Sequence, residues 1–204
     1  ILRLSEDAQA RKDRLQENWA MLQFFWKADV VESWIAEKQA QLQTDDVGHN
    51  LSSVQNLLAK HDTFTSGLKA FENEGIRTII QLKDQLAGSG IQSEKIGQKF
   101  NQVIKRWQTL LAASDSRKSV LKVAEAKYKD IEELFLLFAK KASTFNSWFE
   151  NAEEDLTDPV RCDSIDEIHE LIKAHERFMS TLSSALVEFE ELQHPDQRIK
   201  QLQM

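Results

Sequence analysis

A long segment near the middle of the chain is the feature that most limits its fold. Residues 92–156 contain no proline and only one glycine, Gly97, and hydrophobic residues recur there at alternating steps of three and four. Such steps place side chains on one face of an α-helix. The segment predicts one unbroken helix, roughly 100 Å long at about 1.5 Å per residue, which is too long for a single small bundle. The stripe consists of Ile96, Phe100, Val103, Trp107, Leu110, Ser114, Arg117, Leu121, Ala124, Tyr128, Ile131, Phe135, Phe138, Ala142, Phe145, Phe149, Ala152 and Leu156.

One pattern of residues occurs twice in the chain, 114 residues apart. In both copies a tryptophan is followed after 27 residues by a histidine. A spacing kept in two copies is typical of a modular array and not of a catalytic pocket. We predict that the repeated residues, with Trp107 and Leu110, fill structural cores. The repeated pairs are Trp34 and Trp148, Ile35 and Phe149, Val54 and Ile168, His61 and His175, Phe64 and Phe178, and Leu68 and Leu182.

The segment before the long helix predicts two further helices. Residues 3–42 lack glycine and proline and form the first. The second begins near residue 51, where Ser52 and Gln55 have the spacing of a capping box. Gly75 is the expected weak point of this helix, costing roughly 1 kcal/mol relative to alanine. The turn Gly88-Ser89-Gly90 should end it.

The end of the chain predicts one more helix. Asp158-Pro159 should stop the long helix, because proline cannot continue the backbone hydrogen bonding. Ser164 and Glu167 form a second capping-box spacing. We expect Pro195 to break or kink this last helix after about residue 193.

Composition favours an all-α protein and excludes several classes of function. Six glycines and two prolines leave few turns for a many-stranded fold. The 33 acidic and 26 basic residues are interspersed, so no nucleic-acid groove and no anionic membrane surface is indicated. No hydrophobic run approaches the roughly 18 residues needed to span a bilayer. A single cysteine, Cys162, allows no internal disulfide, which agrees with residence in the reducing cytoplasm.

No pattern points to catalysis, a cofactor or a metal. His169 and His175 are six residues apart and would lie on different helix faces, unlike the i, i+4 pair of a zinc helix. The acidic clusters lack the glycine and ligand spacing of a calcium loop. Trp34, Trp107 and Trp148 fit a three-helix core better than an aromatic cage. Trp19 and Trp26 are expected to be partly exposed, and we predict that the protein is not an enzyme.

Three helices, the last shared without a loop with the next unit, form a pattern that resembles the spectrin repeat family. Within that family the chain is similar to α-spectrins, in repeats toward the carboxyl end. The similarity covers nearly the whole chain. It is carried by residues 22–35 (LQFFWKADVVESWI), 74–76 (EGI) with 82–86 (LKDQL), and 139–162 (AKKASTFNSWFENAEEDLTDPVRC).

The resemblance implies an all-α fold of tandem antiparallel three-helix bundles joined by a continuous helix. We expect residues 1–22 to be the tail of a preceding repeat helix. Residues 23–134 would form a repeat with its long connecting helix, and residues 135–204 a second repeat that lacks its third helix. Further residues or another chain would then supply the missing helix, because an uncovered hydrophobic stripe forfeits about 1.5 to 3 kcal/mol per large side chain.

One departure from strict repetition lies in the connecting helix. Arg11-Lys12 and Leu15 align with Arg117-Lys118 and Leu121 at an offset of 106, eight short of the offset between the tryptophans. Eight added residues extend a helix by about 12 Å and turn it by about 80° beyond two full turns. We expect this insertion to reshape a lateral face for a partner chain.

What the resemblance implies about function is a structural role. The family forms rods in the cytoskeleton at the inner face of the plasma membrane. A chain of the α type would pair laterally and antiparallel with β-spectrin and would be linked indirectly to actin, without inserting into the membrane. An alternative is a helical-bundle interaction module of the α-actinin or plakin type, which would bind signalling proteins or lipid.

Overall fold

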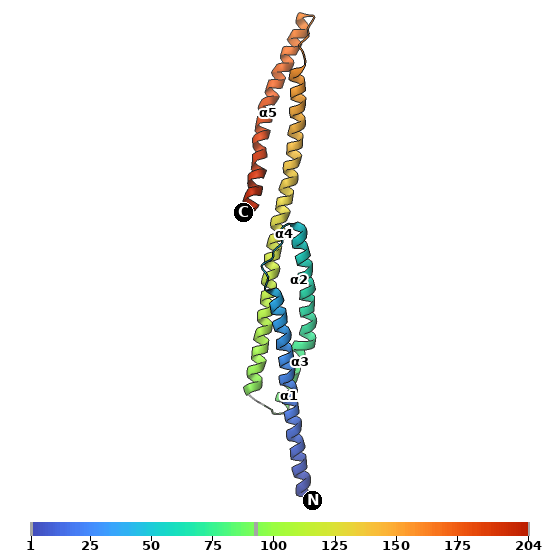
Figure 1. Ribbon diagram of the computed structural model, residues 1–204, viewed down its shortest axis with the longest axis vertical. Coiled ribbons are helices and arrows are strands. Elements are labelled where there is room, and N and C mark those ends of the chain that lie inside the picture. The colour runs from blue at the N-terminus through green and yellow to red at the C-terminus, as the bar shows by residue number, and fades with distance from the viewer. Residues whose placement is uncertain (1, 92–93, 204) are drawn as a thin grey trace. The chain divides into compact units, whose positions relative to one another are not determined.

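The computed structural model describes residues 2–91 and 94–203, and these ranges are almost entirely helical. No β-strand occurs within them, so the predicted all-α class is confirmed. The elements are α1 (Leu2–Leu42), α2 (Leu51–Phe71), the π-helical turn η1 (Glu72–Ile76), α3 (Arg77–Gly88), α4 (Glu94–Thr157) and α5 (Ile165–Gln203) (Figure 1).

The chain divides into two compact units, the first ending at Glu125 and the second beginning at Ala126. Helix α4 contributes to both, since it runs from Glu94 to Thr157. The unbroken helix predicted from the hydrophobic stripe is therefore confirmed from residue 94 onward. Residues 92 and 93, where it was expected to begin, lie outside the described ranges.

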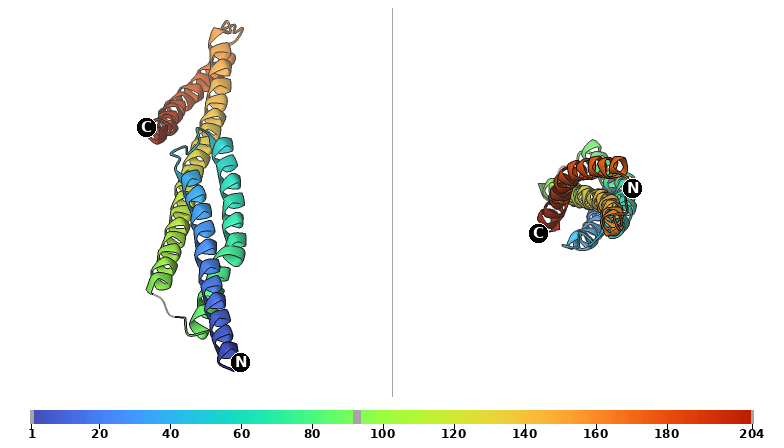
Figure 2. Two further views of the ribbon diagram at one scale, coloured as in Figure 1. Left: turned by 60° about the horizontal axis from the view of Figure 1, so that its bottom comes forward. Right: turned by 90° about the horizontal axis from the view of Figure 1, so that it is seen from above.

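The first unit is a three-helix bundle. Its members are α1, the succession α2, η1 and α3, and the part of α4 up to Glu125, which lie alongside one another in both views (Figures 1 and 2). Hydrophobic residues of all three face inward, as their spacing of three and four requires. The buried cluster consists of Phe24, Ala28, Val31, Ile35, Leu68, Ile76, Ile79, Leu86, Ile96, Val103, Trp107 and Leu110.

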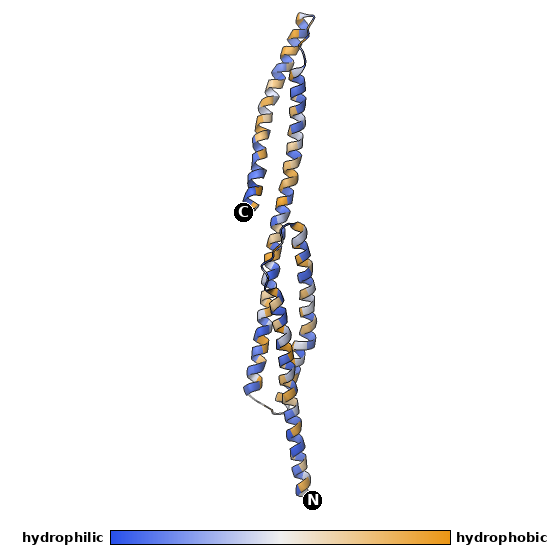
Figure 3. Cartoon of the chain, viewed as in Figure 1, coloured by the Kyte–Doolittle hydropathy of each residue, from blue (hydrophilic) through white to orange (hydrophobic). Residues whose placement is uncertain are grey.

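The second unit consists of the remainder of α4 and the antiparallel α5. Lys141 on α4 and Glu191 on α5 form an ion pair at 2.9 Å, and the rings of Phe145 and Phe189 lie 5.3 Å apart. Hydrophobic residues occur along both helices (Figure 3). Two helices can shield only the surfaces that face each other, so few hydrophobic side chains are fully buried: Ile131, Ala152, Ala185 and Ile199 among the described residues.

The start of α2 differs from its predicted capping box. Asn50, not Ser52, is the N-cap, and its side-chain oxygen accepts a hydrogen bond from the backbone N–H of Ser53 at 2.8 Å. The Ser53 hydroxyl accepts in turn from the backbone N–H of Asn50 at 3.1 Å. Helix α2 begins at Leu51, so Ser53 is its third residue. The capping box therefore joins Asn50 and Ser53, and not Ser52 and Gln55.

The start of α5 agrees with the predicted cap at Ser164. The Ser164 hydroxyl accepts a hydrogen bond from the backbone N–H of Glu167 at 3.2 Å. The Glu167 carboxylate reaches one residue further back than in a strict capping box and accepts from the N–H of Asp163 at 2.8 Å. The turn before it is also as predicted, because α4 ends at Thr157, two residues before Pro159.

Two helix-ending signals had different outcomes. At the end of α3, the N–H of Gly90 bonds the carbonyl of Ala87 and the N–H of Ile91 bonds that of Leu86, while Gly90 has a φ of 75°. These two hydrogen bonds form a Schellman motif, in which the residue after the helix adopts a left-handed backbone that glycine tolerates. Of the break or kink expected near Pro195, the break is wrong, since α5 continues through it to Gln203, and the kink stays a prediction. Only one backbone donor is lost there.

Gly75 lies within η1, where the regular α-helix is interrupted. A Cβ atom at this position would come within 2.6 Å of the Phe71 ring. The Phe71 ring in turn stacks on Trp34 with centroids 3.6 Å apart, so a shift of the ring away from a Cβ atom would disturb this stacking. The absence of a side chain at Gly75 therefore allows the aromatic packing at the π-helical turn.

Candidate functional site

The centre of the first unit is an aromatic contact among its three helical segments. Trp34 of α1 stacks on Phe71 of α2, with ring planes 6° apart. Trp107 of α4 lies 6.4 Å from Trp34 and 6.2 Å from Phe71. Of the predicted core residues in this unit, two are half-buried, Trp34 and Phe64. The buried ones are Ile35, Val54, His61, Leu68, Trp107 and Leu110.

The corresponding residues of the second unit are more exposed than those of the first. Phe149 is 47% exposed and Ile168 is 45% exposed, and His175 is exposed as well. The half-buried members are Trp148, Phe178 and Leu182. The physical reason is the number of helices, since α4 and α5 form only two sides of a bundle. A core role for these residues remains a prediction.

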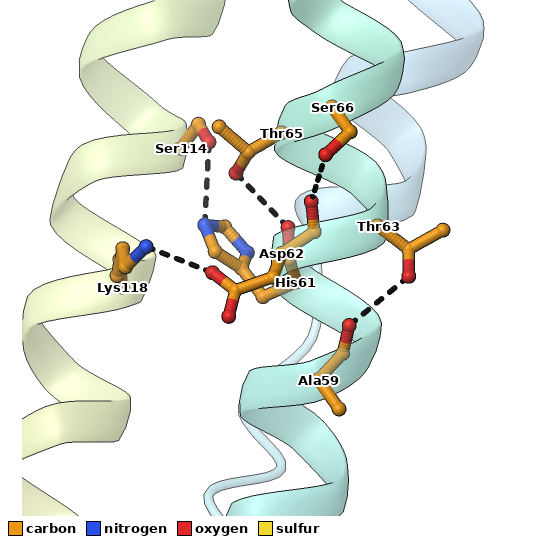
Figure 4. Close-up of polar contacts among 8 residues, drawn as sticks. All are labelled: Ala59, His61, Asp62, Thr63, Thr65, Ser66, Ser114 and Lys118. Atoms are coloured by element: carbon orange, nitrogen blue, oxygen red, sulfur yellow. Dashed lines mark hydrogen bonds and ion pairs between the residues drawn. The ribbon is translucent and has the colours of Figure 1, made fainter.

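A buried polar contact joins α2 to α4 beyond the aromatic centre (Figure 4). The imidazole of His61, 6% exposed, has its Nε2 at 3.3 Å from the hydroxyl of Ser114. Next to it, Lys118 donates to the carboxylate of Asp62 at 2.8 Å. Arg117 donates to the backbone carbonyl of Asp46, in the segment between α1 and α2.

The electrostatics of this contact favour a neutral imidazole. Burial is the main cause that lowers the pKa of His61 from 6.5, and the positive charges of Lys118 and Arg117 lower it further. The charge of Asp62 and the hydrogen bond with Ser114 act in the opposite direction but are weaker than the burial. The hydrogen bond from Lys118 lowers the pKa of the Asp62 carboxyl.

A second polar contact joins α1 to α4 at the other end of the bundle. Lys99 lies 2.7 Å from the carboxylate of Asp29 and 2.9 Å from that of Glu32. Arg106, two helical turns further, lies 3.9 Å from the other oxygen of Glu32. The hydrogen bonds to Asp29 and Glu32 raise the pKa of Lys99, so the ammonium form is favoured.

Exposed hydrophobic side chains gather on the second unit. Three of them, Phe149, Leu186 and Phe189, line a shallow and almost entirely apolar groove between α4 and α5, together with less exposed neighbours. Its lining residues are Phe145, Trp148, Phe149, Leu182, Ala185, Leu186 and Phe189. Exposed hydrophobic patches of this kind indicate a surface that another protein segment covers.

In the part of the chain that the structure describes, there is neither a candidate metal site nor a candidate membrane-spanning helix. Histidine, cysteine and carboxylate side chains do not gather there in groups of three or more that could hold a metal ion. Within the same ranges, no helix has a hydrophobic stretch long enough to cross a bilayer.

Sequence reasoning missed both polar contacts. Ser114 stood out as a polar residue within a hydrophobic stripe, and it lies opposite the one histidine of the facing stripe. A polar residue opposite a histidine, each among hydrophobic neighbours, is the sequence signal that could have predicted this hydrogen bond. The contact of Lys99 with Asp29 and Glu32 had no comparable signal, because charged residues are common on all the outer faces.

Comparisons with known proteins agree with this architecture. The family model described as "Spectrin repeat" matches residues 19–122 and 133–203. Mouse "Spectrin alpha chain, erythrocytic 1" is 44% identical over 200 residues, covering 98% of this chain and 8% of that protein. Chicken "Alpha-actinin-1" and mouse "Alpha-actinin-4" are each 35% identical over 178 residues, covering 86% of this chain and 19% of each relative.

The chain thus spans less than a fifth of the length of these relatives. The match nevertheless covers both units, and it includes the helix α4 that passes from one to the other. The chain belongs to the spectrin repeat family.

Proposed function

We propose that this chain is a rod segment of the submembrane cytoskeleton that pairs laterally and antiparallel with β-spectrin and so contributes to a crosslinked actin network. The observation that carries the proposal is the identity of 44% to a spectrin α chain over 98% of the sequence. The aligned length of 200 residues is large enough to include residues of both units and of the helix α4.

The continuous helix gives this role a physical basis. Because α4 contributes residues to both units, tension or bending applied to one unit reaches the other through backbone hydrogen bonds. A flexible loop at this place would take up the strain by itself. We propose that α4 makes the two repeats mechanically dependent on each other.

The proposed domain plan follows from the same repeats. Residues 1–22 would belong to a preceding repeat, residues 23–134 to one repeat and residues 135–204 to the next. The exposure of Trp19 and Leu22, 62% and 69%, supports the first of these assignments, because such side chains usually need a neighbour.

Sedimentation velocity tests the pairing. The chain is measured alone and after mixing with an amino-terminal fragment of β-spectrin, with a β-spectrin fragment from the carboxyl-terminal half as the matched control. We expect a faster-sedimenting complex with the amino-terminal fragment only. Unchanged sedimentation in that mixture, or equal binding of both fragments, would remove the pairing and leave the fold intact.

The α-actinin matches favour a second candidate, a helical interaction module that does not depend on β-spectrin. In that case the chain would bind a partner of another class, or a copy of itself, through its outer faces. The same sedimentation experiment separates the two, since concentration-dependent self-association without β-spectrin binding supports this alternative.

A further inference from the structure

We propose that the contact of His61 with Ser114 is an acid-sensitive latch, which holds the first half of α2 against α4 near neutral pH and opens locally when the imidazole is protonated. The place of this histidine in the bundle carries the inference. It is buried in the interface between two helices, and its ring nitrogen faces a hydroxyl of the opposite helix.

The surroundings of the ring are poorly suited to a positive charge. From α4, Lys118 and Arg117 already bring two cations to the same place. From its own helix, Asp62 brings one carboxylate, which is engaged by Lys118. The segment between α1 and α2 adds only the backbone carbonyl of Asp46, which is taken by Arg117. The Asp46 carboxylate instead accepts a hydrogen bond from the N–H of Gly48. A protonated His61 would therefore meet more positive than negative charge in a place that water reaches poorly.

The latch lies at the edge of the main core of the first unit. The buried hydrophobic residues Val54 and Leu121 are not part of the large cluster around Trp107 and Leu110, and His61 adjoins that cluster through Phe64, with the two rings 5.8 Å apart. The aromatic centre of Trp34, Phe71 and Trp107 lies further along the bundle. Opening at His61 can therefore separate the start of α2 from α4 while the aromatic centre stays packed.

The direction of the pH effect follows from proton linkage. Folding lowers the pKa of His61 below 6.5, so the unfolded chain binds a proton more readily than the folded one. The contribution of the neutral ring to stability is complete above the unfolded value. It is lost as the pH falls from about 6.5 through the lower pKa of the folded state.

Peptide-resolved hydrogen exchange on the whole chain, corrected for intrinsic exchange rates, tests the latch between pH 7.5 and 5. We expect the opening constant of peptides within α2 near His61 to rise by a factor of about 3 or more on acidification. Peptides from residues 24–35 of α1 serve as the internal reference and should change less. An equal rise in both peptides would mean global destabilisation and would overturn the latch.

Two pairs of variants keep the test decisive. His61→Gln retains a neutral hydrogen-bonding partner for Ser114 and cannot titrate in this range, so the acid-induced rise should disappear. His175→Gln, in the second unit, should leave the rise in α2 unchanged. If His61→Gln disturbs folding, NMR titration of His61 replaces it, with Lys118→Gln expected to raise its pKa and Lys122→Gln expected to have a smaller effect. A pKa of His61 at or above 6.5 in the unaltered chain would contradict the proposal.

Discussion

At the scale of single residues, the absence of a side chain can matter for packing as much as a contact does. Gly75 has no side chain, and that lets the ring of Phe71 lie flat on Trp34. The sequence showed a glycine in a helix, and helix propensity alone assigns such a residue a cost. The benefit arises from a ring four residues away, which propensity does not include.

Exchanging glycines for alanine tests this directly. Gly75→Ala should lower the free energy of unfolding by about 1–3 kcal/mol, because the added methyl group overpacks the stacked rings. Gly67→Ala, in α2, is the matched control, since nothing lies within 4 Å of a Cβ there. It should raise stability by about 0.5–1 kcal/mol. Urea unfolding followed by circular dichroism measures both, and a stabilising Gly75→Ala would contradict the account.

The ion pairs of Lys99 give a second prediction at this scale. Lys99→Met should cost about 1–2 kcal/mol, between the value of an exposed ion pair and that of a fully buried one. The reason is that Glu32, whose side chain is 13% exposed, would keep only the more distant Arg106. Lys95→Met, at an exposed position of the same helix, should change stability little. Equal effects of the two variants in urea unfolding would rule out a special role for Lys99.

At the scale of the elements, the sequence pattern predicted the long regular helices and missed a local irregularity within one of them. Helix α4 follows a regular hydrophobic stripe and α1 a segment without glycine or proline, and the existence and extent of the two helices were predicted from these features. The π-helical turn η1 was missed, although hydrophobic residues on one face of the second predicted helix step by eight residues from Phe71 to Ile79 where seven would be regular. One extra residue in the stripe is what a π turn accommodates.

The caps and the proline show why element ends are harder to predict. At the start of α2, several adjacent polar residues compete to be the N-cap, and the pattern alone does not decide between Asn50 and Ser52. At Pro195, the loss of one donor was weighed without the contacts of the surrounding helix. Ile199 beyond it is buried, and this burial favours continuation of α5.

The continuity of α4 leads to a prediction for the element itself. Val123 is 71% exposed, so replacing it changes little packing. Val123→Pro removes the N–H that bonds the carbonyl of Ser119 and should cost about 3 kcal/mol. Val123→Ala is the control and should be nearly neutral. If α4 couples the two units, the proline should also split a shared urea transition into two, and an unsplit transition would argue against coupling.

At the scale of the whole molecule, the two units differ in how much they bury. In the first, three helical segments enclose a large cluster, whereas in the second a pair of helices leaves Phe149 and Ile168 exposed. The repeat in the sequence predicted corresponding inward-facing residues in both units, and the missing third helix expected for residues 135–204 implied an uncovered hydrophobic stripe in the second. A core role for the second set of residues remains a prediction, because their burial depends on a further helix that covers the stripe.

Local stability should follow that difference. Amide protons of α5 should exchange faster than those of α2, because fewer buried contacts hold α5 in place. Hydrogen exchange at pH 7.5, read by mass spectrometry, compares peptides around Leu182 with peptides around Leu68. Equal protection of the two would show that the exposed surface of the second unit is covered in solution, for example by self-association.

The central claim is that one helix passes without interruption from the first unit into the second. Backbone Cα chemical shifts of residues 112–130, measured by NMR on the isotope-labelled chain, test it most directly. We expect helical shifts at every position in this range. A run of coil-like shifts at three or more consecutive residues between Ala112 and Ala126 would contradict the continuous helix and, with it, the proposed mechanical role.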